Sequence, residues 1–314
     1  MRRTERILRY LGIMFPPLTH VPQAAAMFSG TYFTLQALGG LTPLRLGSGA
    51  VAGGACLLLA LLLVRLYDDV RDADADLRLA RSGDPRYASR PTVTGLVTVP
   101  EIRALCAANI VALLGLNLAF GGPLMRLTCL LGGLLTWLSF RWFFIPALAR
   151  DPKPLAYLAR KSLTVVLGIY VVAVFADGWE ASRLTVWTAP LVLAPCLEAA
   201  AWEVSRKIRI ESDETAYGTY SKALGPRGAA ALTALFILAA GACLIPVAAA
   251  ARLSWLYSAA VTGAAAAAIL ACFRFGTSPS RAGANLRPYA EWFGAVANGG
   301  LAAAVGLRYG GILR

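Results

Sequence analysis

The chain has 314 residues, of which 58% are apolar and 15% charged, and its mean hydropathy is +0.61. Soluble domains carry roughly a quarter of charged residues, so this composition excludes an ordinary water-soluble enzyme as well as a disordered or collagen-like chain. The net charge of +13 is typical of a basic cytoplasmic face, and because no basic stripe with interleaved aromatic residues occurs, we expect no nucleic-acid partner.

The amino-terminal segment carries Arg2, Arg3, Arg6 and Arg9 ahead of the first apolar run. That run begins late and is long enough to span a membrane, so we expect no cleavable signal peptide. The four arginines are expected to lie along the membrane surface.

Nine apolar stretches have about the 20 residues that a helix needs to cross the hydrocarbon core. In chain order they are 16–38, 46–67, 99–120, 124–148, 155–176, 185–206, 228–251, 253–275 and 288–307. They predict an all-α integral membrane protein: one domain, 1–314, with nine transmembrane helices in a bundle around a central cavity.

The distribution of Lys and Arg over the connections tests this arrangement of spans. Of the 30, 21 lie in the amino-terminal segment, in the connections after the second, fourth, sixth and eighth spans, or near the span ends that border those connections. The positive-inside rule then predicts a cytoplasmic amino terminus and places the polar connections 68–98 and 207–227 in the cytoplasm. We expect a bacterial cytoplasmic membrane, with the chemistry on its cytoplasmic side.

The second span ends in YDDVRDADAD, which contains Asp68, Asp69, Asp72 and Asp76. On a continuing helix the last three fall within an arc of about 60°, with Asp68 on the same side. Carboxylates gathered on one face repel one another unless a cation joins them, and Mg²⁺ bound to a substrate phosphate would do so. The alternative is a solvated helix end that Arg65, Arg71 and Arg78 neutralise.

Histidine and cysteine offer no other metal site. His20 is the single histidine, and the six cysteines lie in apolar runs without zinc-like spacing, so we interpret them as packing residues. Any metal must therefore bind to carboxylates, which favours Mg²⁺.

A second charged segment, WEVSRKIRIESDETAYGTYS, closes the sixth span. Glu203, Lys207 and Glu211 recur every four residues, and Asp213 and Glu214 follow. Two acidic clusters with basic residues between them suit a diphosphate carried by Mg²⁺. Taken alone, the same spacing also fits ion pairing on an exposed helix.

YDDVRDADAD followed by SRPTVTG resembles the UbiA-type intramembrane prenyltransferases, relatives of 4-hydroxybenzoate polyprenyltransferase. Their first signature is (N/D)DxxDxxxD, which Asp68, Asp69, Asp72 and Asp76 match. An RPxxxG stretch follows, matched by Arg90, Pro91 and Gly95. The second motif departs from the family's DxxxD pair, because Glu203 and Lys207 stand at that spacing.

The resemblance implies a Mg²⁺-dependent enzyme that ionises an isoprenoid diphosphate and transfers the prenyl group to a small aromatic or lipophilic acceptor. The residues expected to act in catalysis are Asp68, Asp69, Asp72, Asp76, Glu203 and Lys207. The expected metal ligands are Asp68, Asp69, Asp72, Asp76, Glu203, Glu211, Asp213 and Glu214. The cations expected to bind the diphosphate are Arg90, Arg150, Lys153, Arg160, Lys161, Arg206 and Lys207.

Aromatic faces would stabilise the resulting carbocation. Candidates are Trp137, Phe140, Trp142, Phe143 and Phe144 in the fourth span, with Phe28, Tyr32, Tyr170 and Trp202 elsewhere.

Polar residues inside the predicted spans cost free energy in hydrocarbon, so each of them needs a reason to be there. They are His20, Gln23, Asn109, Asn117, Arg141, Glu198 and Asn298. His20, Gln23 and Glu198 are candidates for orienting an acceptor or acting as a base, while others are expected to bond across helices.

Two alternatives remain open at this point. A terpene cyclase of the same superfamily would ionise farnesyl or geranylgeranyl diphosphate and let the cation attack its own double bonds; the unusual second motif favours this option. A more remote alternative is a non-catalytic binder or transporter of lipid diphosphates.

Overall fold

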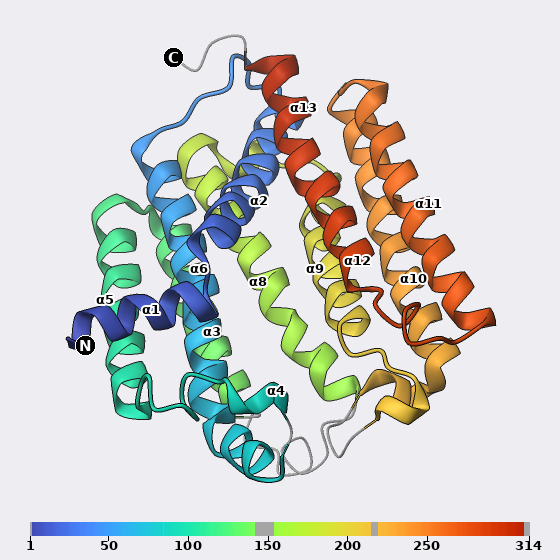
Figure 1. Cartoon of the computed structure of the whole chain (residues 1–314). Helices are drawn as coiled ribbons and strands as arrows, with labels where there is room; N and C mark the ends of the chain where they lie inside the picture. The colour runs from blue at the N-terminus through green and yellow to red at the C-terminus, as the bar shows by residue number, and fades with distance from the viewer. Residues whose placement is uncertain (1, 84, 142–153, 215–218, 311–314) are drawn as a thin grey trace.

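The computed structural model describes residues 2–83, 85–141, 154–214 and 219–310, and the side chains of 85, 86 and 154–163 fall outside that description. The described chain is built from helices and their connections (Figure 1). The helices are α1 Arg3–Met14, α2 Pro17–Leu38, α3 Ser48–Arg81, α4 Pro85–Ala88, α5 Val99–Phe120, α6 Pro123–Phe140, α8 Pro154–Trp179, α9 Thr188–Ser205, α10 Tyr220–Ala250, α11 Trp255–Thr277, α12 Arg287–Gly294 and α13 Gly300–Tyr309, with short turns at η2 Ala181–Arg183, η3 Glu211–Asp213 and the π-helical η4 Ala295–Gly299.

Five of these helices, α3, α5, α6, α10 and α11, are long and apolar enough to cross a membrane. The chain is therefore an integral membrane protein with an all-helical described fold. Helices occupy most of the described residues in each of the nine predicted ranges. Nine crossings, a central cavity and a cytoplasmic amino terminus stay predictions.

Helix boundaries follow local sequence signals. Thr98 and Glu101 form a capping box at the start of α5, in which Glu101 accepts from the Thr98 backbone at 2.9 Å. Thr219 caps α10 by accepting from the Lys222 backbone at 3.1 Å. Farther along α10, Gly225 adopts a φ of +72°, which glycine reaches without strain, and the helix changes direction there.

The helices pack side by side as one bundle. α9 lies between α8 and α10, α11 packs on α10, and α3 packs against α5 and α8. α13 returns along α2, so the carboxyl-terminal helices close the bundle against its beginning (Figure 1). Buried apolar residues from these helices form one large core, with a smaller cluster where α9, α10 and α11 end or begin near Val204 and Phe275.

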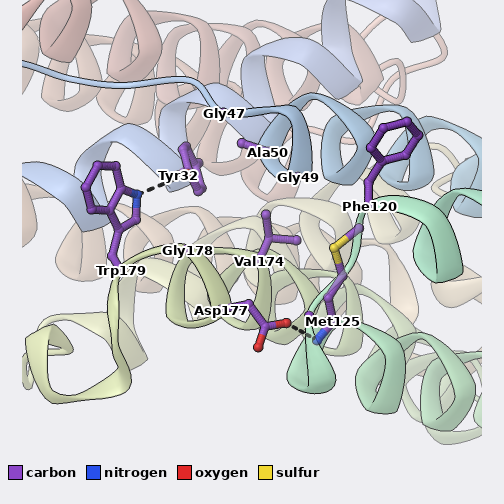
Figure 2. A pocket seen from close by; sticks show the side chains of 11 residues that line it. Tyr32, Gly47, Gly49, Ala50, Phe120, Met125, Val174, Asp177, Gly178 and Trp179 are labelled. Carbon is purple, nitrogen blue, oxygen red and sulfur yellow. Dashed lines mark hydrogen bonds between the residues drawn. The ribbon is translucent and has the colours of Figure 1, made fainter.

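Asp177 of α8 caps a neighbouring helix. Its carboxylate accepts from the backbone N–H groups of Leu124 and Met125 in the first turn of α6, at 3.1 and 2.7 Å. Figure 2 shows the bond to Met125. Asp177 lines a cavity of about 170 Å³ near the Tyr32–Trp179 hydrogen bond and lies close enough to Gly122 that no Cβ fits there. The carboxylate thus satisfies helix N–H groups that have no partner within the helix itself.

We expect Asp177→Ala to lower the free energy of unfolding by about 1 kcal/mol, because two backbone donors of α6 lose their acceptor. The thermal midpoint of the purified protein in detergent measures this loss. Glu180→Ala, an exposed carboxylate three residues away, is the matched control and should leave the midpoint unchanged. Equal midpoints for both variants would contradict the capping role.

Candidate active site

α3 continues fourteen residues beyond the predicted end of the second span at Tyr67 and carries the first acidic motif on its last turns. Asp69 and Asp76 point inward, with side chains 8% and 12% exposed. Asp68 and Asp72, farther round the helix, are 42% and 50% exposed. The expected arc of carboxylates is present, and it straddles the boundary between the buried and the exposed face.

Arginines of the same helix pair with these carboxylates. Arg65 lies 2.7 Å from Asp69, and Arg71 lies 2.6 Å from Asp68 and 2.8 Å from Asp72. This pairing is what a neutralised helix end predicts for Arg65 and Arg71. The burial of Asp69 is not, because a solvated helix end would leave that carboxylate in water.

The RPTVTG stretch, residues 90–95, contacts the aspartate motif of α3. In the RPTVTG turn the Arg90 carbonyl accepts from the backbones of Val93 and Thr94, both at 2.9 Å. Gly95 then takes a φ of +72°, which explains why glycine occupies this position. The turn places the Arg90 guanidinium 3.7 Å from Asp76. Arg90 and Asp76, fourteen positions apart in the chain, therefore belong to one site.

Tyr10 contributes a contact that the sequence did not predict. Its hydroxyl donates to Asp69 Oδ2 at 2.7 Å, and Arg6 of the same helix donates to Glu101 at 2.6 Å. Burial, together with the nearby Asp69 charge, raises the pKa of Tyr10, so the phenol remains a donor. α1 is thus held against α3 and α5, across which it lies (Figure 1), and a position of its arginines along the membrane surface stays a prediction.

The second motif is a buried ion cluster at the end of α9. Glu203 Oε1 lies 2.9 Å from Lys207 Nζ, and both side chains are about 5% exposed or less. Arg206 also donates to both Glu203 oxygens, at 2.8 and 2.9 Å. The spacing of four residues therefore does make an ion pair, but a buried one.

Two of the other predicted metal ligands of this segment have partners of their own. Glu214 accepts from the hydroxyls of Thr219 at 2.6 Å and Ser221 at 2.7 Å, and Asp213 pairs with Arg281 at 2.9 Å. Glu211 is exposed in the η3 turn. Glu203, Asp213 and Glu214 thus each have different hydrogen-bond or ion-pair partners.

Both motifs lie at the same end of the bundle, where α3 and α9 end and α10 begins (Figure 1). α8 packs against both α3 and α9 and connects the two sides. Within the described residues, no three His, Cys, Asp or Glu side chains are grouped closely enough to hold a metal ion. The oxygen donors of Asp69 and Asp76 nevertheless suit Mg²⁺, which commonly takes one or two carboxylates and completes its shell with phosphate and water.

Several of the predicted cations and aromatic residues, or their side chains, lie outside the described part of the chain. Arg150 and Lys153 lie outside the described residues, as do Trp142, Phe143 and Phe144. Arg160 and Lys161 lie in α8, near its beginning, but their side chains fall outside the description. Phe140 stacks on Tyr67 at 5.1 Å, which puts an aromatic pair beside Asp68.

Polar residues within the spans mostly bond between or within helices. Asn109 donates to the Leu59 carbonyl at 2.8 Å, and Tyr170 donates to Asn117 at 3.0 Å. Asn298 in η4 donates to buried Glu198 of α9. These contacts give the polar groups structural roles, and the proposed acceptor or base role of Glu198 stays a prediction.

A comparison with protein-family models gave no match, and a comparison with curated proteins gave none either. Among solved structures, a UbiA homologue from Aeropyrum pernix K1 aligns with a TM-score of 0.62 and 21% identity over 90% of this chain and 97% of that one. A digeranylgeranylglyceryl phosphate synthase aligns with a TM-score of 0.64 and 13% identity over 96% and 99%. The chain therefore has the fold of the UbiA-type proteins.

Proposed function

We propose that the chain is a magnesium-dependent intramembrane prenyltransferase that ionises an isoprenoid diphosphate and transfers the prenyl group to an acceptor. The observation that carries the proposal is the burial of Asp69 and Asp76 at the bundle end that also holds the Glu203–Lys207 pair. One of the two similar structures is, by name, a synthase of digeranylgeranylglyceryl phosphate, and we transfer its general class of activity.

In the proposed reaction the allylic C–O bond breaks, and its electron pair leaves with the diphosphate. The acceptor then donates an electron pair to the carbocation and loses a proton. Mg²⁺, when bound, would neutralise the leaving group and so lower the barrier. Asp69 and Asp76 would hold the ion. Arg90, 3.7 Å from Asp76, and the Lys207 ammonium would add fixed positive charge toward the diphosphate.

The same end of the bundle is proposed to face the cytoplasm of a bacterial cell. The connections there carry Arg90, Lys207, Arg209 and Arg281, and the positive-inside rule assigns such connections to the cytoplasmic side. A soluble diphosphate headgroup would then reach the site from the cytosol while its prenyl tail stays among apolar helices.

Product analysis tests the proposal. Purified full-length protein in detergent is incubated with Mg²⁺ and geranyl, farnesyl or geranylgeranyl diphosphate. Each donor is tested alone and with 4-hydroxybenzoate or geranylgeranylglyceryl phosphate as acceptor. We expect diphosphate release that depends on an acceptor, and a prenylated acceptor detected by mass spectrometry.

Two results would contradict the transferase proposal. A cyclic hydrocarbon or alcohol formed without acceptor would assign the chain to the terpene cyclases. Absence of diphosphate release from every donor, combined with binding of a prenyl diphosphate, would favour a non-catalytic binder.

A further inference from the structure

A basic pocket of about 240 Å³ opens at the bundle end that carries the two acidic motifs. It lies between the connection from α9 to α10 and the connection from α11 to α12. Its polar lining consists mainly of arginines, with one carboxylate and one amide. The lining residues that matter here are Arg206, Arg209, Arg281, Arg287, Asp213 and Asn285.

Positive charge exceeds negative charge in this pocket. Arg281 forms a two-bond pair with Asp213, with both N···O distances at 2.9 Å, yet 81% of its side chain remains exposed. Arg287 pairs with Glu291 at 2.7 Å and is also more than half exposed. Arg206 is likewise paired, with Glu203, so the four lining arginines meet three carboxylates, Asp213, Glu203 and Glu291, and the net charge stays positive. The pocket would therefore attract an anion.

Aromatic residues place the pocket at a membrane–water boundary. The guanidinium carbons of Arg206 and Arg287 lie 4.9 and 5.9 Å from the centre of the Trp202 ring. On α12, which begins at the pocket, Tyr289 and Trp292 are exposed. Tryptophan and tyrosine gather at the level of lipid headgroups, and α10 and α11 beside the pocket are apolar enough to span the bilayer.

The pocket adjoins the Glu203–Lys207 pair through Arg206, which lines it, but it lies apart from the aspartates of α3. Figure 1 shows the end of α3 and the connection from α11 to α12 on opposite sides of the bundle. Two helices, α8 and α9, stand between them in the packing order. An anion in this pocket would therefore not be the diphosphate held at Asp69 and Asp76.

We propose that this pocket binds the phosphate headgroup of an anionic membrane phospholipid. Planar guanidinium groups present forked donors that match phosphate oxygens, and Asn285 adds an amide donor. Basic pockets between membrane helices on the cytoplasmic side suit such headgroups, and the exposed aromatic face of α12 would lie along the acyl chains. This proposal does not depend on the proposed prenyl transfer.

Lipid retention tests the pocket. The full-length protein is reconstituted in nanodiscs of phosphatidylcholine mixed with phosphatidylglycerol, extracted in mild detergent and analysed by native mass spectrometry. We expect wild-type protein to retain phosphatidylglycerol preferentially. The double variant Arg281→Gln, Arg287→Gln should weaken that preference by about tenfold or more, since two cations that would face the headgroup are removed.

The single variant Arg209→Gln leaves the Arg281–Asp213 and Arg287–Glu291 pairs in place and should weaken the preference severalfold. Arg183→Gln, Arg308→Gln, at the opposite end of the bundle, is the matched control and should retain it (Figure 1). Unchanged preference in both pocket variants would overturn the proposal. Displacement of the lipid by equimolar inorganic phosphate or glycerol 3-phosphate would overturn the assignment to a membrane lipid.

Discussion

Asp76→Asn is expected to slow diphosphate release by on the order of 100-fold, because an amide of the same size replaces a carboxylate proposed to hold Mg²⁺. Asp76 suits this test because its side chain is only 12% exposed and the Arg90 guanidinium lies 3.7 Å away. The Arg90 side chain is 36% exposed and can be solvated when Asp76 loses its charge, so we expect the fold to survive. The measurement is the rate of pyrophosphate release from farnesyl diphosphate.

Asp74→Asn is the matched control. Asp74 lies on the same helix two residues before Asp76, but it is exposed and outside the matched signature. Its substitution should leave the rate within twofold or so of wild type, since exposed surface changes have small effects. Mn²⁺ binding in the presence of inorganic pyrophosphate, followed by electron paramagnetic resonance, gives a second readout. Equal rates and equal Mn²⁺ affinities for both variants would remove Asp76 from the proposed site.

The first motif was largely predictable because its residues share one helix. Helical periodicity alone places Asp69 and Asp76 almost in line, and the structure buries both. The contact from Tyr10 to Asp69 was not predictable, because the two residues are 59 positions apart and no periodic pattern links α1 to α3. A basic amphipathic segment indicates a surface, but it does not identify which surface.

The contacts of the second motif were much less predictable from the sequence. Its spacing predicted contact between Glu203 and Lys207 but could not distinguish a metal ligand from an ion pair, or a buried pair from an exposed one. Long-range packing decides both questions. Asp213 is bound by Arg281, 68 positions later, and Glu214 by the hydroxyls before and inside α10. Such partners are set by how α9, α10 and α11 end together.

Glu203→Gln is expected to lower the free energy of unfolding by on the order of 3 kcal/mol, because it removes a carboxylate 2.9 Å from the buried Lys207 ammonium. Glu203→Gln combined with Lys207→Met should regain most of that stability, since the buried pair is replaced by neutral side chains of similar size, and Arg206, which also loses the Glu203 charge, is 38% exposed to solvent. Thermal midpoints in detergent measure both effects. Glu291→Gln is the control, because the Arg287–Glu291 pair has the same spacing but is exposed and should contribute less than about 1 kcal/mol.

The double variant Glu203→Gln, Lys207→Met distinguishes a structural role of the buried pair from a role in catalysis. If the Lys207 ammonium serves the leaving diphosphate, Glu203→Gln, Lys207→Met should be folded yet release diphosphate at least about 100-fold more slowly than wild type. Its response to Mg²⁺ should also change, because a fixed cation has been removed beside the substrate and more charge must come from solution. A stable double variant with the wild-type rate and Mg²⁺ dependence would make the buried pair purely structural. The fixed charge for the leaving group would then have to come from Arg90, beside Asp76.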